Sequence, residues 1–491
     1  MTEKKISLVS ATALSIATMI GSGWLFSAQL SAKYAGNLAF LAWILAALFV
    51  MGVGLCLASV VEVFPVTGAT SRSSALSHNN IFGMPFAFAN WFGILVVVAN
   101  EAQATGQYLF AAMKDSTFMR GDQVTALGKG GEVAIVLLYL IINFYGIKLL
   151  TRFNNTLTII KIVVPLATIG LLLTTHFDKT NFSLVTNTMY SSHSVINALI
   201  GAGLIYSMNG YQTVASFAAE IKNSKRNVPL AIVLSITIVT ILYIALQFSF
   251  MGAVPHQELV NGWSKLNFSS PLYQLAIILN LNVLAISLVA DSIISPSGTG
   301  CAYLGSTSRM LFGMSKQGQF PAWFAQINPG DHFSRRSLIF NYIIATIVLL
   351  CGDTWAGLMV LVTGCNIIGY MAAPISMGAI KPKNRIFGVI VFFVITLLMT
   401  TLPRNDMLVI DAVMSIIMLV YLLTQLRVMS ISRVLSFVLP FIIYLWCFYL
   451  FPNAYILGVL AIIFYILVTN KKYVTYCAKF RQAEVNWKGS D

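Results

Sequence analysis

Two ionisable side chains lie deep inside long apolar stretches of the sequence. Glu101 follows Asn100 in the middle of the stretch at 81–113, and Lys161 lies about eight residues into the stretch at 154–175. Burying a charge in an apolar medium is costly, so such residues are candidates for binding or for moving protons. Glu101 can bind a cationic group or carry a proton, or it can simply hydrogen-bond to a neighbouring helix.

An ammonium group taken out of water can exchange its proton near neutral pH, so Lys161 is a candidate for proton coupling. The alternatives for Lys161 are a structural ion pair and a side chain that reaches toward water.

Two other acidic residues interrupt apolar stretches. Asp291 begins DSIISPSGTG, whose proline and glycines are expected to bend or loosen a helix, so a structural kink is favoured there over ligand contact. Asp411 lies near the start of the apolar stretch at 408–426 and has no predicted role.

The first apolar stretch, 8–32, is interrupted at its centre by MIGSGWLFS, residues 19–27. Two glycines and a serine there weaken a helix, and irregular backbone survives in hydrocarbon only where protein or a wet cavity surrounds it. A broken helix is predicted, although the glycines can also serve close helix packing. The candidate binding residues at this break are Ile20, Gly21, Ser22, Gly23 and Trp24.

The sixth stretch, 194–219, has a similar interruption within GAGLIYSMNGYQTVAS, residues 201–216. Two broken helices at corresponding places of two five-helix halves predict an inverted-repeat transporter with its site near the bilayer midplane. The candidate binding residues at this second break are Tyr206, Ser207, Met208 and Asn209, followed by Gly210.

The broken helices suggest what the site binds. A half-helix that begins after Gly21 presents free N–H groups and a positive dipole end, which suits a carboxylate. A half-helix that ends near Tyr206 to Met208 presents unpaired carbonyls, which suit an ammonium group. A zwitterion such as an α-amino acid matches both ends, although another small amphoteric solute does so as well. The aromatic side chains of Trp24 and Tyr206 either cover the bound solute as gates or fill the core.

Composition assigns the chain to the α-helical polytopic membrane proteins. Of the 491 residues, 58% are hydrophobic and 9% are charged, and apolar runs of about 20 residues, enough to cross the hydrocarbon core, recur throughout. Fourteen apolar segments are expected, although the short, closely spaced last four also allow twelve spans with a re-entrant piece. These segments lie roughly at 8–32, 38–62, 81–113, 132–149, 154–175, 194–219, 229–253, 273–304, 337–352, 355–380, 386–402, 408–426, 434–451 and 455–470.

The distribution of charge predicts the orientation. An even number of spans puts both termini on one side, and a cytoplasmic N-terminus places most of the 30 Lys and Arg residues in cytoplasmic loops and in the basic tail. The net charge of +14 is then explained by topology and by anionic lipid. Nucleic acid is not an expected partner, because no loop carries a dense basic patch with interleaved aromatic residues.

The sequence predicts neither a cofactor nor a metal site. The six cysteines occur singly, the five histidines are scattered over loops, and no phosphate-binding glycine motif is present. An enzyme is not expected, because no nucleophile and base or metal set lies inside the spans. A membrane channel or receptor stays open as an alternative class.

Five blocks in chain order resemble the amino acid–polyamine–organocation permeases. They are MIGSGWLF in the first span, FPVTGA after the second, TRFNNTLTIIK at 151–161, EIKNSKRNVPLAI at 220–232 and STSRMLFGMSKQGQFPAWFAQINP at 306–329. Within this family GSGWLF, NEAQATGQYL and SPSGTGCAYLGSTSR look most like the aspartate–proton symporter branch. Two positions depart from the family pattern, Ser59 and Ser224, and both lie at predicted cytoplasmic helix ends.

The resemblance implies a fold, a mechanism and a location. The implied fold is a five-plus-five inverted-repeat (LeuT-like) core at 1–385, with repeats at about 8–175 and 194–380. Accessory helices at 386–470 and a basic cytoplasmic tail at 471–491 complete it. By this resemblance, Lys161 occupies the position at which relatives bind sodium. Its ammonium group is then expected to tether the first span to the eighth. The implied activity is proton-coupled, alternating-access uptake of an amino acid across a bacterial cytoplasmic membrane, with protons and membrane lipid as partners.

Substrate identity and coupling are left open by the residues. An acidic substrate needs a cation in the pocket, and Lys161 is the one Lys or Arg expected at mid-membrane, where the coupling role already occupies it. Exchange without net proton movement is an alternative to symport. The oligomeric state is not predicted.

Overall fold

The computed structural model describes residues 6–65, 69–113, 115–120, 123–145, 147–183, 190–327, 334–352, 354–425, 431–451 and 453–470. Side chains are described for these residues except 145, 147–158, 219, 424–425 and 431–437. The predicted basic tail at 471–491 lies outside the described residues.

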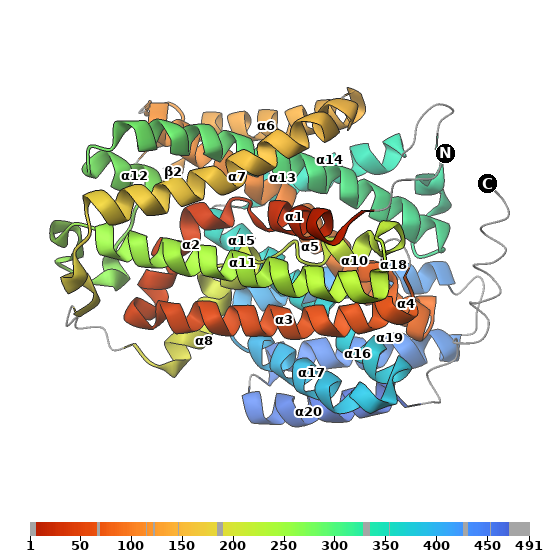
Figure 1. Ribbon diagram of the computed structural model, residues 1–491. Helices are drawn as coiled ribbons and strands as arrows, with labels where there is room; N and C mark the ends of the chain where they lie inside the picture. The colour runs from red at the N-terminus through yellow and green to blue at the C-terminus, as the bar shows by residue number, and fades with distance from the viewer. Residues whose placement is uncertain are drawn as a thin grey trace.

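Long helices lying roughly side by side make up nearly all of the structure (Figure 1). Up to residue 175 they are α1 (Leu8–Met19), α2 (Gly23–Ala35), α3 (Ala39–Val63), α4 (Ala69–Ser77), α5 (Asn80–Met113), α6 (Ala126–Tyr145) and α7 (Ile147–Thr175). Then follow α8 (Ser192–Gly201), α9 (Leu204–Ser207), α10 (Thr213–Ser216), α11 (Ser224–Ala253), α12 (Pro271–Ile278), α13 (Asn282–Lys316), α14 (Arg335–Cys351), α15 (Trp355–Tyr370) and α16 (Ala372–Ile380). The last four helices are α17 (Arg385–Met399), α18 (Arg404–Gln425), α19 (Ile431–Leu450) and α20 (Ala454–Val468).

Short elements connect these helices. The 3-10 helices are η1 (Gly36–Leu38), η2 (Lys179–Ser183), η3 (Ala218–Glu220), η4 (His256–Leu259), η5 (Trp263–Lys265), η6 (Ala322–Ala325) and η7 (Pro382–Asn384). A two-residue antiparallel pair, β1 (Met119–Arg120) with β2 (Gln123–Val124), is the one sheet within the described residues.

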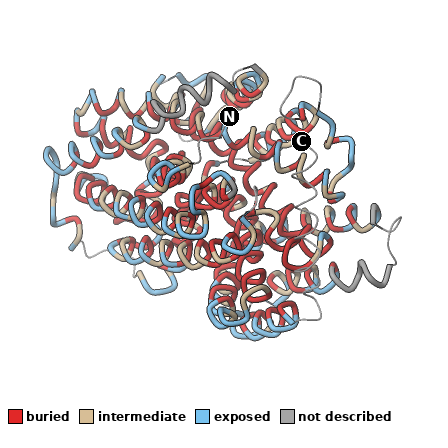
Figure 2. The backbone as a smooth tube through the Cα atoms, turned by 45° about the vertical axis from the view of Figure 1, so that its right-hand side comes forward, coloured by how far each residue is buried: buried red, intermediate tan, exposed pale blue. Residues whose placement is uncertain are grey.

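The all-α polytopic membrane class is confirmed. Among the described residues, eight helical stretches are long and apolar enough to cross a membrane, judged by length and composition. Large apolar side chains point outward from the bundle, such as Ile386 on α17 and Ile416 on α18, which are 77% and 61% exposed. Figure 2 shows buried residues on the inner sides of the helices and exposed ones on the turns that face outward. In water this surface would favour aggregation, whereas lipid tails solvate it.

Helix α5 lies at the centre of the bundle. Its most apolar 18-residue window is completely buried, and it packs against α15, α13 and α4. Around it, α3 packs against α11, and α1 packs against α11. Glu101 lies on this central helix, so its charge is surrounded by protein.

Each predicted apolar segment overlaps helix, including separate helices for the last four. The eighth segment differs from its prediction, because a left-handed residue, Asn280 at φ 56°, separates α12 from α13. Helix α13 then continues beyond the predicted end at 304 to Lys316 and includes Pro296 without a break. The expected loosening at DSIISPSGTG is therefore not seen as an interruption of the helix.

The N-terminal segment is joined to the loop before α11 by main-chain hydrogen bonds. The Ile6 amide donates to Glu220 O and the Lys222 amide donates to Ile6 O, each at 2.9 Å. These bonds form a parallel β-bridge between Ile6 and Ile221. The beginning of α1 is thereby fixed to the segment that follows α10.

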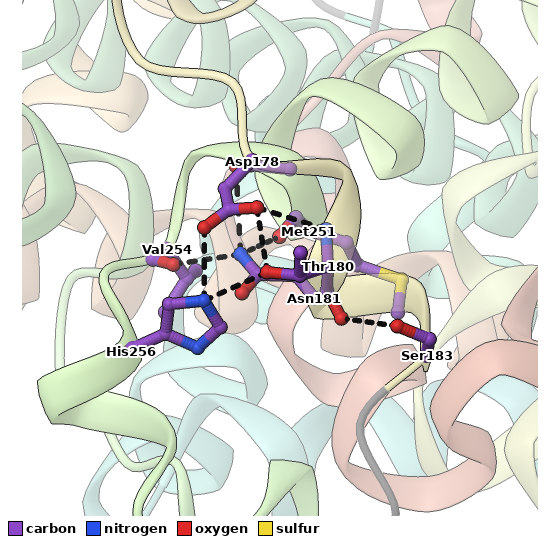
Figure 3. A network of polar contacts seen from close by, with 8 residues as sticks. Asp178, Thr180, Asn181, Ser183, Met251, Val254 and His256 are labelled. Carbon is purple, nitrogen blue, oxygen red and sulfur yellow. Dashed lines mark hydrogen bonds and ion pairs between the residues drawn. The ribbon is translucent and has the colours of Figure 1, made fainter.

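A polar network joins the segment that follows α7, including η2, to the end of α11 (Figure 3). Asn181 Nδ2 donates to Met251 O at 2.9 Å and to Val254 O at 2.8 Å, at the end of α11. Beside it, hydrogen bonds from the Thr180 hydroxyl and amide hold the pKa of Asp178 below its usual value, and His256 Nε2 lies 2.8 Å from Asp178 Oδ2. Asn181 is fully buried, so it supplies donors to carbonyls that the helix itself cannot satisfy.

Asn181→Ala is expected to lower the free energy of unfolding by about 1–3 kcal/mol, because it leaves buried carbonyl groups without a donor. Thermal unfolding of the detergent-purified protein measures this loss. Ser183→Ala is the control, since Ser183 is exposed and donates one local bond to Thr180 O. Equal unfolding temperatures for the two variants would contradict the role given to Asn181.

Candidate functional site

Both predicted helix breaks are present, and they lie against each other. The first falls at residues 20–22, between α1 and α2. Thr18 Oγ1 donates to Gly210 O at 3.1 Å, and the Ser27 and Ser207 hydroxyl oxygens are 2.7 Å apart. A Cβ atom at Gly23 would lie 2.9 Å from Ser207 Cα, closer than two carbon atoms approach without a shift. Glycine at 23 therefore allows the two interrupted helices to meet.

The second interruption is longer than predicted. Besides the expected break after Ser207, the chain leaves the helix between α8 and α9, where Gly203 is left-handed at φ 71°. Gly210 is also in the positive-φ region, at 120°. Glycine adopts these conformations with little strain, whereas other residues do not. The helical turn between the two breaks, α9, has four residues.

Glu101 lies at the start of α2, where the sequence predicted a site for a carboxylate. The Ser22 amide donates to Glu101 Oε2 at 2.9 Å, and the Tyr206 hydroxyl donates to Oε1 at 2.9 Å. Glu101 is 1% exposed, and a Cβ atom at Gly21 would lie 2.7 Å from its Oε1. A carboxylate of the chain itself thus accepts from a main-chain N–H group that was expected to be free.

Trp355, which was not among the candidate residues, supports this arrangement. Its Nε1 donates to Ser22 Oγ at 3.0 Å. Its ring packs edge-on against Tyr206 with centroids 5.6 Å apart and stacks on Phe26 at 4.4 Å. A tryptophan at the start of a span is typical of the membrane interface, so the residue type alone did not indicate a contact with the first break.

Lys161 joins three helices. Its Nζ donates to Thr299 Oγ1 on α13 at 2.7 Å and to Ala17 O in the last turn of α1 at 3.2 Å. These bonds connect the first span to α13, the contact that the family resemblance implied for this lysine. The side chain is 5% exposed, and both hydrogen bonds go to neutral oxygens. A cation beside the carbonyl end of α1 is favoured by the helix dipole.

The carbonyl end of the second break differs from its prediction. Tyr206 O accepts the Asn209 amide at 2.9 Å, and Ser207 O accepts the Tyr243 hydroxyl at 3.2 Å. The expectation of unpaired carbonyls is therefore wrong for Tyr206 and Ser207. The same hydroxyl of Tyr243, on α11, lies 3.2 Å from Met19 O, so its single proton is shared between the two carbonyls. One hydroxyl thus lies against the C-terminal ends of both broken segments, where buried carbonyls require a donor.

The other candidate residues are all buried. Ile20, Trp24 and Met208 are fully buried, and Asn209 is 5% exposed. Asn209 Oδ1 accepts bonds from Gln212 Nε2 at 2.5 Å and from Tyr370 OH at 3.2 Å. Tyr206 contacts Glu101, whereas burial of Trp24 fits either of its two predicted roles.

The two remaining acidic residues have different surroundings. Asp291 is fully buried, and its Oδ1 accepts a bond from Ser295 Oγ, one turn along the same helix, at 2.6 Å. Asp411, on α18, is also fully buried, and neither carboxylate oxygen has a hydrogen-bond partner within the described part of the chain. The bond within α13 fits the structural role that the sequence favoured for Asp291.

A family model described as "Amino acid permease" matches residues 6–476. The chain is 33% identical to a Bacillus subtilis glutamate/serine transporter, AimA, over 78% of this chain and 72% of the relative. It is 28% identical to the aspartate-proton symporter of the same species, over 78% and 74% of the two chains. It is also 25% identical to that species' methylthioribose transporter, over 70% and 74%.

These comparisons confirm the resemblance to the amino acid–polyamine–organocation permeases. They also confirm that the chain is a transporter and not an enzyme. The third relative is named for a sugar derivative, so similarity at this level does not by itself determine the solute.

Gly23→Ala is expected to lower the free energy of unfolding by about 1–3 kcal/mol, because the added methyl group meets the backbone of Ser207. Gly170→Ala is the matched control: nothing lies within 4 Å of a Cβ atom there. In that helix alanine is expected to be neutral or slightly stabilising. Thermal unfolding of both variants in one detergent tests this, and similar stability for the two would show that the helices do not meet as described.

Proposed function

The chain belongs to the amino acid permease family, and on that premise we propose that it is a secondary transporter that takes up an α-amino acid together with a proton. Two of the relatives reported above are named as amino acid transporters, and the multi-pass helical architecture is that of an integral membrane protein. Coupling to protons, the substrate and the binding residues are the proposed part.

The observation that supports this proposal most is the carboxylate of Glu101 at the Ser22 amide. The N-terminal end of α2 binds a carboxylate through a main-chain donor, with the Tyr206 hydroxyl beside it. The carboxylate of an amino acid presents the same atoms. We therefore propose that the substrate replaces Glu101 at Ser22, between the two breaks formed by Ile20–Trp24 and Tyr206–Asn209.

This replacement gives the proton a role. A charged Glu101 competes with the substrate for Ser22, whereas a protonated Glu101 is a weak acceptor and releases the amide. Proton binding at Glu101 thus promotes substrate binding, which is the requirement for symport. Lys161 is the second group through which a proton can act in this proposal, because its Nζ connects α1 and α13 through Ala17 O and Thr299 Oγ1. The tether is present while the Lys161 ammonium group keeps its proton, and it is released when that group gives its proton up to the cytoplasm.

The substrate we propose is a small neutral or acidic amino acid. The named substrates of two relatives, glutamate or serine and aspartate, fall in this class. An acidic side chain needs an additional donor. Lys161 is already bonded to Thr299 and Ala17, so polar groups such as the Asn209 amide would have to bind a second carboxylate.

The proposed organisation follows the sequence prediction. The core comprises residues 1–385, with repeats at about 8–175 and 194–380, and helices α17–α20 form the accessory part at 386–470. Both termini face the cytoplasm of a bacterial cell, in its cytoplasmic membrane, because that orientation places most basic residues inside.

Purified protein in liposomes is expected to accumulate labelled serine, alanine, glutamate or aspartate when the outside is more acidic than the inside. Lys161→Ala should reduce this accumulation to that of liposomes without protein, because the tether can no longer respond to protonation. Lys179→Ala, an exposed lysine just after α7, is the control and should transport normally. Proton-independent uptake by the unmodified protein, supported by internal amino acid alone, would instead establish an exchanger.

Glu101→Gln is expected to bind the transported amino acid about five- to tenfold more tightly at neutral pH, because a neutral amide competes less well than a carboxylate for the Ser22 N–H group. Binding to the unmodified protein should tighten as the pH falls, and binding to the variant should not change with pH. Calorimetric titration in detergent measures both. Weaker binding by the variant would mean that Glu101 instead binds the ammonium group of the substrate.

A further inference from the structure

We propose that a cavity at one end of α3 is a binding site for a membrane phospholipid with an ammonium headgroup, of the phosphatidylethanolamine class. The cavity has a volume of about 420 Å³ and lies between α3, α11, α16 and α17. Its lining residues are Leu55, Ala58, Ser59, Glu62, Pro229, Met377, Asn384 and Phe387. None of these belongs to the proposed transport site, so the two proposals are independent.

The cavity is apolar at one end and polar at the other. Its four α3 residues are spaced as one face of a helix, and Leu55 lies about 10 Å along the helix axis from Glu62. Leu55 lies at the end of the cavity away from Glu62, which is in the last turn of α3, and the buried Met377 also lines the cavity. The Asn384 side chain, from η7, is exposed on the same side. This gradient matches a phospholipid that places its acyl chain inward and its headgroup at the helix end.

The surroundings of the cavity face lipid. Phe387 lines it and is 39% exposed, and Ile390, one turn further along α17, is 55% exposed. Leu230 and Leu234 on α11 are likewise exposed apolar residues. An apolar recess in such a surface is filled more favourably by an acyl chain than by water, because water there would lack hydrogen-bond partners.

A pair of opposite charges determines which headgroup fits. Glu62 forms an ion pair with Lys381 at the polar end, and the two side chains are 47% and 26% exposed. A carboxylate has lone pairs for more than one donor, so Glu62 can accept from a headgroup ammonium while Lys381 binds the phosphate. An anionic headgroup without an ammonium group would meet the Glu62 carboxylate with like charge.

A lipid in this position would connect two parts of the bundle. Helices α3 and α11 pack against the broken segments α2 and α1, while α16 and α17 lead into the last helices of the chain. The accessory helices contact the core directly as well, so the lipid adds to this contact instead of replacing it. Its removal is expected to destabilise the protein without displacing Glu101 or Lys161.

Native mass spectrometry of the purified protein, after addition of phosphatidylethanolamine or phosphatidylglycerol with identical acyl chains, tests the proposal. The unmodified protein is expected to retain one phosphatidylethanolamine about tenfold more strongly than phosphatidylglycerol. Glu62→Gln should lose this preference, and Ser59→Leu, which fills the cavity and leaves the charges in place, should weaken retention of both lipids. Glu258→Gln, which removes an exposed carboxylate on η4, is the control and should behave as the unmodified protein.

Thermal unfolding curves are recorded for all variants, and lipid retention is compared at a temperature at which every variant is folded. Equal or stronger retention of phosphatidylglycerol by the unmodified protein would overturn the proposal. So would unchanged retention of phosphatidylethanolamine in Glu62→Gln. Transport in liposomes is not the readout, so a failure of the transport proposal and a failure of the lipid proposal are distinguishable.

Discussion

The structure depends on one constraint: hydrocarbon offers no hydrogen bonds, so each interruption of a membrane helix has to be satisfied by the protein itself. An unpaired main-chain group in that medium costs several kcal/mol. At the first break this requirement is met by Glu101, and at the second by Tyr243 and by local turns. Buried polar side chains thus supply the partners that the interrupted backbone lacks.

The two breaks also satisfy each other. Thr18 bonds to Gly210 O, and Ser27 bonds to Ser207, across helices that are almost 200 residues apart in the chain. If either interrupted helix were absent, the polar groups of the other would lose these hydrogen-bond partners. This mutual dependence is the reason for small residues on both sides: Gly23 and Gly210 bring the two backbones close enough for short side chains to reach across.

Much of this arrangement could be predicted from the sequence, because glycine, serine and asparagine weaken a membrane helix and mark where an apolar run is interrupted. The positions of both breaks were predicted in this way, and the tether at Lys161 followed from the family resemblance.

The link between Glu101 and Ser22 could not be predicted, since nothing local to either residue specifies a partner 79 positions away. Trp355 and Tyr243 were missed because aromatic residues are common in membrane helices, and only the fold shows which ones have a polar partner. The additional break at Gly203 was missed because a single glycine in a helix is usually tolerated.

The β-bridge at Ile6 has a consequence for how such proteins diverge. Both of its hydrogen bonds use main-chain atoms of Ile6, Glu220 and Lys222, so most side chains can be exchanged at these positions while the link between the first and sixth helices persists. Proline at position 6 is the exception, because it lacks the donor. A mechanical connection of this kind can be inherited through long evolutionary drift and leave almost no recognisable signature in the residues that form it.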